Sequence, residues 1–211
     1  MIKSYRHVVT ANPRTALRSR VRNVIRNFSG RVGVSAQNLT TGEEFNINEQ
    51  TVFPTLSSIK LAILTELFYQ EQEGRLRLEE KITVTRSDQR GGTGVLRDLT
   101  PPIELSLRDL AVLMITVSDN TCTWLVSDKV GQPNVNTRMR SLGFKKMELR
   151  SDGGPTTFEQ VEHMDIDGYA VSSPADMTGL IGLIAQGKIL SEKACAEIIE
   201  ILRMCQGVDY L

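Results

Sequence analysis

A lysine inside an apolar helical segment is the feature of this sequence that most restricts how the chain can fold. Residues 57–73 carry apolar side chains at helical spacing, including Leu64 and Phe68, and Gly74 ends the segment. Lys60 lies within this apolar run. Burying an ammonium group is unfavourable by several kcal/mol unless the group is paired or loses its proton. The fold must therefore give Lys60 polar neighbours or a reason to be neutral.

A serine three residues earlier gives Lys60 a chemical partner. Ser57 and Lys60 are spaced to lie on one face at the start of the helix, whereas Ser58 faces elsewhere. A desolvated lysine loses part of its preference for the charged form, and a neutral amine can take a proton from a hydroxyl. The helix N-terminus also favours the anion formed when a serine attacks a carbonyl. The alternative is that a serine only caps the helix while Lys60 extends to solvent.

Ser118, Asp119 and Asn120 form a second polar group, at a break between two apolar helical segments. Polar side chains at such a junction can project from a rigid support into a cleft. Helix capping alone also favours these residue types, so the triplet has a purely structural alternative. Asn120 is the residue that we expect to cap the second of the two helices.

The remaining pattern predicts one hairpin and several helices. A two-stranded hairpin is marginal in water, so it needs further strands or a layer of helices over it. The first predicted elements are a helix from Asn12-Pro13 to Gly30 and a hairpin, whose strands have alternating Val32, Val34 and Ala36, and Phe45 and Ile47, on either side of a turn at Thr41-Gly42. An extended segment at 81–85 follows. Further helices are predicted over 107–117, with a Ser106 and Asp109 capping box, from Asn120 to Gly131, from Ser173-Pro174, with Asp176, and over 192–205.

Charge and composition exclude several classes of function. Lys and Arg balance Asp and Glu at 25 each, so no overall field favours nucleic acid. Residues 1–30 hold seven Lys or Arg and no acidic residue; we interpret these as the solvated face of a helix whose apolar face holds Leu17 to Phe28, in preference to a membrane-surface helix. No apolar run reaches the length of a membrane span, and the N-terminus lacks the apolar core of a signal peptide.

Other candidate sites are weaker. Cys122, Cys195 and Cys205 are an odd number, and we expect neither a structural disulfide nor a nucleophilic role for Cys122, which has no basic partner. The "GGTG" segment lacks the lysine and the strand-to-helix context of a phosphate-binding loop, so we interpret it as a turn. No His, Cys, Asp and Glu cluster has metal-ligand spacing, and we expect no metal and no cofactor.

The "SSIK" and "SDN" segments, about 60 residues apart, together resemble the active-site serine penicillin-recognising family, which includes class A β-lactamases and penicillin-binding proteins. The "TTGEEF" turn, the "FPTLSSIKLAIL" context, the "GGTGVL" loop, "LRDLAVLMITVSDNT" and "SSPADMTGLIGLI" resemble that family in order and spacing, over residues 15–205. The resemblance implies an α+β fold of the β-lactamase and transpeptidase type, in which a helical subdomain accompanies an antiparallel sheet covered by helices. It implies a single domain over 12–211, with an α/β part formed by 12–53 and 190–211 and a helical part formed by 54–189.

The resemblance also implies residue roles. Ser57 would be the acylated nucleophile and Lys60 its proton acceptor. Ser118 would relay a proton to the leaving nitrogen, and Asn120 would hold the side-chain amide of the substrate. The backbone N–H of Ser57 would be one donor to the oxyanion.

Two parts of the family pattern have no counterpart here. The segment between Leu142 and Ser172 lacks a glutamate followed a few residues later by asparagine, the pair that activates the deacylating water in class A enzymes. We interpret its carboxylates and its lone histidine as solvated loop residues; they are Glu159, Glu162, His163, Asp165 and Asp167. The Lys-Thr-Gly or Lys-Ser-Gly triplet and the C-terminal strands are also missing before Leu211. We therefore expect a truncated chain with impaired activity, because loss of one oxyanion donor costs about 10²–10³ in rate.

The sequence therefore predicts a serine acyl-transfer hydrolase, acylated at Ser57 by β-lactams or D-Ala-D-Ala-like peptides and slow to deacylate. The alternatives are a degenerate, non-catalytic relative that acts as a binding or scaffold module, and an esterase that uses the same dyad. The expected partner is a small-molecule substrate and not nucleic acid, with self-association or a further C-terminal segment completing the sheet. The compartment stays open, because the family suggests an extracytoplasmic location and the sequence shows no signal segment.

Overall fold

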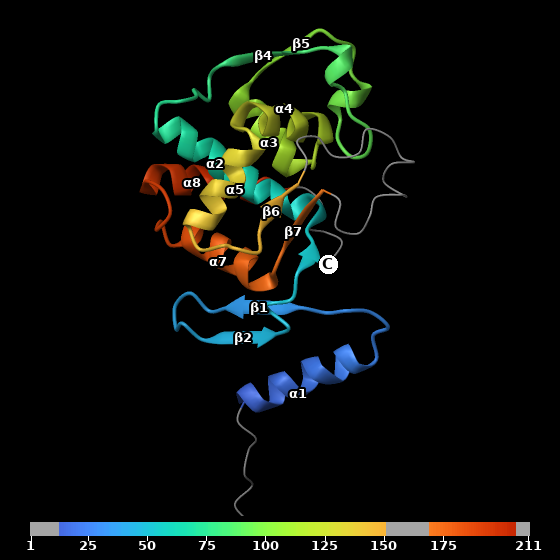
Figure 1. Cartoon of the computed structure of the whole chain (residues 1–211), viewed down its shortest axis with the longest axis vertical. Helices are drawn as coiled ribbons and strands as arrows, with labels where there is room; N and C mark the ends of the chain where they lie inside the picture. The colour runs from blue at the N-terminus through green and yellow to red at the C-terminus, as the bar shows by residue number, and fades with distance from the viewer. Residues whose placement is uncertain (1–12, 151–168, 206–211) are drawn as a thin grey trace, which may run out of the picture.

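The computed structural model describes residues 13–150 and 169–205, and combines a cluster of helices with small antiparallel sheets (Figure 1). The helices are α1 (Pro13–Arg26), α2 (Lys60–Gln72), α3 (Leu107–Thr116), α4 (Asn120–Val130), α5 (Gln132–Ser141), α7 (Pro174–Ala185) and α8 (Glu192–Arg203), with 3₁₀ turns η1 (Leu56–Ile59), η2 (Arg86–Asp88) and η3 (Leu96–Asp98). The strands are β1 (Val34–Gln37), β2 (Glu44–Ile47), β3 (Phe53–Pro54), β4 (Lys81–Val84), β5 (Ile103–Ser106), β6 (Glu148–Leu149) and β7 (Ala170–Ser172). The predicted α+β class is confirmed.

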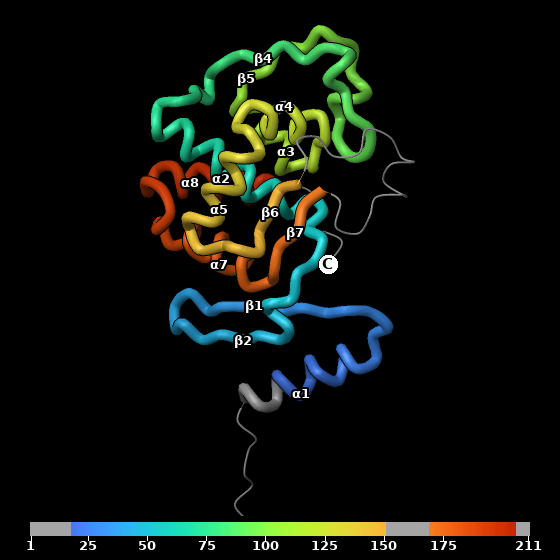
Figure 2. Tube along the Cα trace, in the orientation of Figure 1, coloured from blue at the N-terminus to red at the C-terminus, as the bar shows by residue number. Residues whose placement is uncertain are grey.

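Helix α2 is the centre of the helical cluster. It packs against α3, α4, α5 and α8, and its trace runs among them in Figure 2. Ala62, Ile63, Leu64 and Leu67 have no exposed surface. A helix that is apolar on most sides belongs in a core, so the long apolar run is explained by burial on several faces.

The predicted hairpin is confirmed. β1 and β2 pair antiparallel with Val34 opposite Ile47, and the Asn38 side chain accepts hydrogen bonds from the N–H groups of Thr40 and Thr41 in the turn. Its contact with the helical cluster is through α7, where the Thr178 hydroxyl donates to Ser35 O at 2.9 Å. The layer that the hairpin needs is therefore supplied in part by α7.

Helix α1 lies outside the hairpin and covers little apolar surface. The predicted apolar face is partly in solvent, since Val24 is 72% and Phe28 60% exposed, whereas Val21 and Ile25 are half-buried. The guanidinium of Arg18, which we expected on the solvated face, stacks 5.8 Å from the ring centre of Phe45. The helix thus leaves an apolar surface open, formed by Val24 and Phe28.

The extended segment predicted at 81–85 is confirmed as β4, whereas its pairing with β5, the sheet of β3, β7 and β6, and helix α5 were not predicted from the sequence. β4 pairs antiparallel with β5, and β7 lies between β3 and β6. The pairing of Phe53 with Ser172 brings the chain that enters η1 beside the chain that enters α7. Strands β3, β6 and β7 have two or three residues, too few for a period-2 pattern to appear, and α5 is too polar to give an apolar stripe.

Most predicted helix starts are confirmed by their caps. Ser106 and Asp109 form the reciprocal capping box of α3, and Ser173 and Ser191 accept backbone N–H groups at the starts of α7 and α8. The prediction for α4 is wrong by one residue. Its cap is Asp119, whose carboxylate accepts from Cys122 N, because the Asn120 side chain is engaged elsewhere.

The last helix belongs with the other helices. Helix α8 packs against α2, α3 and α7. Its buried residues, among them Ile198 and Ile201, join the main hydrophobic core. Among the described residues, α7 packs against strand β1 of the hairpin. The division into an α/β part with 190–211 and a helical part over 54–189 stays a prediction.

Candidate active site

The entry to α2 presents a serine and a lysine on one side of a tight turn. Ser57 lies in η1 and Lys60 begins α2, so the α-helix starts one turn later than predicted. Side chains three residues apart nearly eclipse each other in a 3₁₀ turn, which aligns Ser57 with Lys60. Ser57 is exposed, whereas only 4% of Lys60 is exposed. The hydroxyl is therefore accessible to a substrate while the amine lies inside the protein.

Ser118 connects the two groups. It lies between α3 and α4, and its hydroxyl donates to Ser57 Oγ at 2.9 Å. Lys60 Nζ donates to Ser118 Oγ and to Ser118 O, each at 2.8 Å. Among the described residues, Ser57 and Lys60 are linked by this route through Ser118 and not by a direct hydrogen bond. The three groups form one continuous hydrogen-bonded chain.

The backbone at Ser118 has an unusual conformation. Its φ is 55°, in the left-handed region, which costs a residue with a side chain about 1 kcal/mol or more. Leu56, directly before Ser57, is also left-handed, with a φ of 47°. Two strained residues thus border the same hydroxyl pair, and the surrounding contacts must hold them.

Burial changes the acid–base behaviour of Lys60. Desolvation lowers the pKa of Lys60 from 10.5 to about 8, and the nearby Asp119 and Cys122 offset part of this effect. Its ammonium has three acceptors, the two oxygens of Ser118 and Asn120 Oδ1 at 3.3 Å. A lysine whose pKa lies near neutral pH can alternate between donor and proton acceptor, as a general base requires.

Asn120 joins Lys60 to the glycine-rich loop of residues 91–96. Its Oδ1 accepts from Lys60, its Nδ2 donates to Gly91 O at 2.9 Å, and its backbone N–H donates to Thr93 O at 3.0 Å. The predicted turn at "GGTG" is confirmed, with left-handed φ at Gly92 and Gly94. Asn120 is therefore fixed on two sides next to the hydroxyl pair.

Asp119 anchors that loop, a role that the sequence did not reveal. It is fully buried, and its carboxylate accepts the N–H groups of Val95 at 2.6 Å and Leu96 at 2.9 Å. A β-carbon on Gly94 would lie 2.5 Å or less from atoms of Asp119, so only glycine allows this approach. An aspartate directly before a predicted helix was the one signal for an anchoring cap.

Cys122 is an unreactive neighbour of the site. It is fully buried, and burial together with the Asp119 carboxylate raises the pKa of its thiol well above the usual range. The thiolate, which is the nucleophilic form, is therefore scarcely populated. This agrees with the expectation that Cys122 is not a nucleophile.

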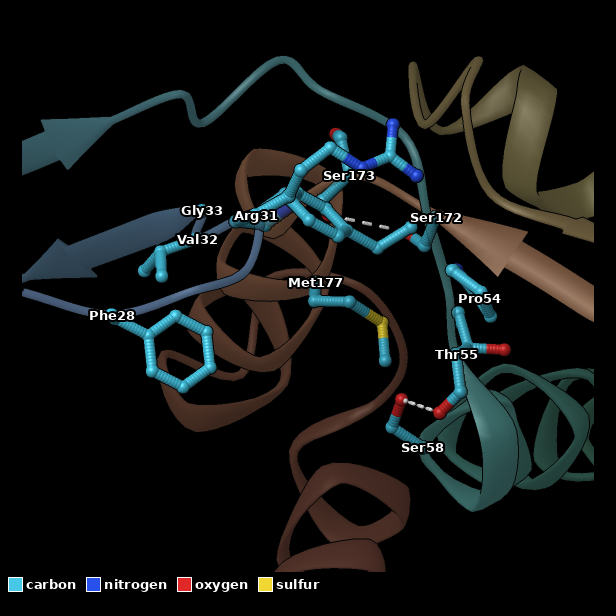
Figure 3. Close-up of a pocket in the computed structure, with 12 residues that line it drawn as sticks. Phe28, Arg31, Val32, Gly33, Pro54, Thr55, Ser58, Ser172, Ser173 and Met177 are labelled. Atoms are coloured by element: carbon cyan, nitrogen blue, oxygen red, sulfur yellow. Dashed lines mark hydrogen bonds between the residues drawn. The ribbon is translucent and has the colours of Figure 1, made fainter. Parts of the chain in front are cut away.

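A hollow of about 410 Å³ opens beside η1 (Figure 3). Its walls are mainly apolar, and Figure 3 shows Met177 between Phe28 on one side and Ser58 on the other. Ser58 donates its hydroxyl to Thr55 O at 2.6 Å, so it is occupied locally and separate from the Ser118 and Lys60 chain. This supports the choice of Ser57 over Ser58 as the candidate nucleophile.

The structure does not describe the loop residues that we interpreted from the sequence. The loop carboxylates and His163 lie outside the described residues; the carboxylates are Glu159, Glu162, Asp165 and Asp167. Within the described ranges, no three or more His, Cys, Asp or Glu side chains gather as a metal site would require. Over the same ranges, none of the helices has both the length and the apolar character needed to span a bilayer.

Comparison with known proteins gives one consistent family. The family model of the "Beta-lactamase enzyme family" matches residues 16–208. The chain is 28% identical to the imipenem-hydrolyzing beta-lactamase of Enterobacter cloacae over 183 residues, which are 82% of this chain and 58% of that protein. It is 27% identical to beta-lactamase PSE-4 of Pseudomonas aeruginosa over 129 residues, 58% of this chain and 42% of that protein. The chain thus spans about half the length of these relatives.

The fold agrees with solved structures. The structure of PBP-A superposes with a TM-score of 0.81 and 28% identity, covering 92% of this chain and 70% of that chain. The matched part therefore includes nearly all of this chain and leaves part of PBP-A unmatched. This similarity confirms the predicted fold type.

Proposed function

Because the chain belongs to the Beta-lactamase enzyme family, we propose that it is a serine acyl-transfer hydrolase whose nucleophile is Ser57. The substrates would be β-lactams or D-Ala-D-Ala-like peptides. One observation carries the proposal, namely the hydrogen-bonded chain from Ser57 Oγ through Ser118 Oγ to the buried Lys60 Nζ. It joins an accessible hydroxyl to an amine that can hold its proton.

Proton transfer follows the hydrogen-bonded chain. When Lys60 is neutral, its lone pair accepts the Ser118 hydroxyl, which in turn accepts the Ser57 hydroxyl, because hydroxyl protons rotate freely to suit their partners. As Ser57 Oγ bonds to the substrate carbonyl carbon, its proton passes to Ser118 and the Ser118 proton passes to Lys60. Lys60 becomes an ammonium and Ser118 is unchanged.

The reverse transfer releases the leaving group. The ammonium returns a proton through Ser118 to the leaving nitrogen as the carbon–nitrogen bond breaks, and an ester to Ser57 remains. The Ser57 N–H, in the first turn of η1, is one of the N–H groups that a helix start leaves without an internal partner. We assign it to the developing oxyanion.

Asn120 is the proposed contact to the substrate side chain. One of its two amide protons is used by Gly91 O and its Oδ1 by Lys60. The second amide proton remains, within the described residues, for a carbonyl oxygen of the substrate. The Asn120 side chain would then contact both the substrate and the Lys60 amine that takes the proton.

Deacylation is proposed to be slow. The sequence between Leu142 and Ser172 lacks the glutamate and asparagine pair that resemblance to class A enzymes would require. A variant of PBP-A, the solved structure that resembles this chain, was determined as its acyl-enzyme complex with penicillin G. Slow loss of the ester would make the protein a better penicillin binder than a penicillin hydrolase.

Intact mass spectrometry after incubation with benzylpenicillin tests the proposal. We expect one covalent adduct per chain, persisting over the incubation, and none on Ser57→Ala. Ser58→Ala is the matched control and should keep the adduct, because the hydrogen bond of the Ser58 hydroxyl in the described residues goes to Thr55 O of its own turn. Absence of an adduct on the unmodified protein would overturn the proposal in favour of a non-catalytic binding module.

A further inference from the structure

We propose that Thr93 is a positioning residue for the acyl transfer, because its hydroxyl holds the Ser118 carbonyl and so keeps Ser118 Oγ between Ser57 and Lys60. The inference rests on the proposed function. Thr93 lies in the glycine-rich loop, and its Oγ1 donates to Ser118 O at 2.8 Å. Its side chain touches neither Ser57 nor Lys60 in the hydrogen-bond network of the described residues, so it would act through Ser118 alone.

The Ser118 peptide needs an external clamp. Its left-handed φ of 55° is disfavoured, so the backbone relaxes unless neighbouring groups fix it. Ser118 O receives two hydrogen bonds, from Thr93 Oγ1 and from Lys60 Nζ, each at 2.8 Å. These bonds use both lone pairs of the carbonyl. The orientation of the peptide, and with it the direction of the Ser118 side chain, depends on two donors.

Only one of these donors is constant during the proposed reaction. The Lys60 ammonium has three protons for its three acceptors, whereas the neutral amine has two. The bond to Ser118 Oγ reverses when Lys60 accepts a proton, and the amine must shift to aim its lone pair. Thr93 does not take part in this exchange. Its bond to Ser118 O can therefore persist through both states of the amine.

The loop that carries Thr93 is well fixed. Thr93 O accepts from Asn120 N at 3.0 Å, and the Asp119 carboxylate accepts from the N–H groups of Val95 and Leu96, two and three residues later. Gly92 and Gly94 approach Asn120 and Asp119 too closely for any β-carbon. The Thr93 side chain itself is exposed, so it contributes no core packing. Its hydroxyl is held in place by a rigid loop and is available for a positioning role.

The test compares Thr93→Val with Thr93→Ser. Valine keeps the shape and removes the donor, whereas serine keeps the donor. We expect the second-order acylation rate with benzylpenicillin to fall about three- to tenfold in Thr93→Val, the usual effect of one hydrogen bond, and to change less than about twofold in Thr93→Ser. Equal rates in the unmodified protein and both variants would overturn the inference.

A second readout separates positioning from simple stabilisation of the loop. Without Thr93, Ser118 O becomes a stronger acceptor for the Lys60 ammonium, which favours the charged amine. The Lys60 pKa, measured by NMR of the ¹³Cε-labelled lysine, should therefore rise in Thr93→Val and stay unchanged in Thr93→Ser. The titratable groups that face Lys60 in the described residues are Asp119 and Cys122, and neither substitution alters them.

The outcomes distinguish the inference from the proposed function. A chain that forms no penicillin adduct contradicts the proposed function, but the NMR titration of Lys60 remains measurable. If Thr93→Val lowers the melting temperature and leaves both the Lys60 pKa and the acylation rate unchanged, Thr93 only stabilises the loop and the inference is wrong. If Thr93→Ser behaves as Thr93→Val does, the hydroxyl is not the active feature and the inference is again wrong.

Discussion

Lys60 is the residue on which the proposed chemistry depends most, because it is buried with three hydrogen-bond acceptors and with its pKa lowered to about 8. A structural lysine needs only its partners, whereas a general base must also lose its proton. Two substitutions separate these roles. Methionine removes the amine and keeps the apolar stem, while arginine keeps the charge and the donors but does not deprotonate.

We predict that Lys60→Met and Lys60→Arg both lower the acylation rate with benzylpenicillin by about 10²–10⁴, the usual contribution of general base catalysis. Stopped-flow or mass-spectrometric time courses give the rate, and circular dichroism checks that each variant folds. An arginine variant with nearly normal acylation would show that the cation and not the base is needed.

The pH dependence follows from the same group. Its pKa is lowered below the usual value, so the neutral, proton-accepting form grows as the pH rises through about 8. We expect the acylation rate to rise about tenfold per pH unit below this value and to level off above it. The check is acylation measured from pH 6 to 10. A flat profile, or one that falls over this range, would contradict the assignment of Lys60 as base.

At the scale of single residues, the sequence indicated which side chains meet but not how. The spacing of Ser57 and Lys60 and the Ser118 triplet brought all four predicted site residues to one place. The route through Ser118 depends on the 3₁₀ turn and on the left-handed φ at Ser118, and local sequence does not predict either. Their catalytic roles stay predictions.

At the scale of elements, the junction of α3 and α4 and the glycine-rich loop form one unit. The carboxylate of Asp119 is buried within this unit and accepts hydrogen bonds from the backbone N–H groups of Val95, Leu96 and Cys122. Gly94 lies directly against Asp119, with a φ of 115°. The loop cannot move away from the junction without breaking these hydrogen bonds. A substitution at Gly94 should therefore disturb the candidate active site.

We predict that Gly94→Ala lowers the free energy of unfolding by roughly 1–3 kcal/mol more than Gly74→Ala does, because the new methyl group must displace Asp119. Gly74 is the matched control, since it too has a left-handed φ, of 70°, but nothing lies within 4 Å of its added β-carbon. Urea denaturation gives both values. Equal losses would mean that the contact between loop and junction is loose.

Helices and strands with a long sequence pattern were predicted better than those with a short one. The start of α3 was predicted correctly from its capping box of Ser106 and Asp109, and Gly131 ends α4 as expected. The two-residue strands β3 and β6 depend on pairing with a distant β7, and nothing local indicates such a pair. The cap of α4 was placed at Asn120 because asparagine is a good cap, although the aspartate before it holds the helix.

At the scale of the whole molecule, one exposed apolar surface lies at the end of α1, beside the hairpin. Val24 and Phe28 of the α1 end are mostly exposed, and Phe28 also borders the apolar hollow beside η1. Apolar surface of this kind commonly marks an interface. We propose that a second copy of the chain covers it; this surface differs from the sheet edge through which the sequence predicts self-association.

The double variant Val24→Ser with Phe28→Ser should weaken self-association by at least about tenfold in dissociation constant, since burial of two such side chains contributes about 1.5–3 kcal/mol each. Sedimentation equilibrium measures the constant. Met204→Ser, at another exposed apolar residue, is the control and should leave it unchanged. A monomer at all concentrations in the unmodified protein would contradict the proposal.

The overall fold was predicted through the family resemblance and is confirmed. Family motifs identify the order of elements, but which helix packs on the hairpin depends on long-range contacts, here those of Thr178 with Ser35. The contact between α7 and β1 joins residues 143 positions apart in the sequence, and no local pattern encodes it.

The most direct measurement is peptide mapping of the penicillin adduct by tandem mass spectrometry. If the buried amine activates the exposed hydroxyl through Ser118, the modification lies on Ser57 in the peptide that contains Lys60, and on no other serine. A modification on Ser58 or Ser118, or on a scattered set of lysines, would contradict the account even if the chain were labelled.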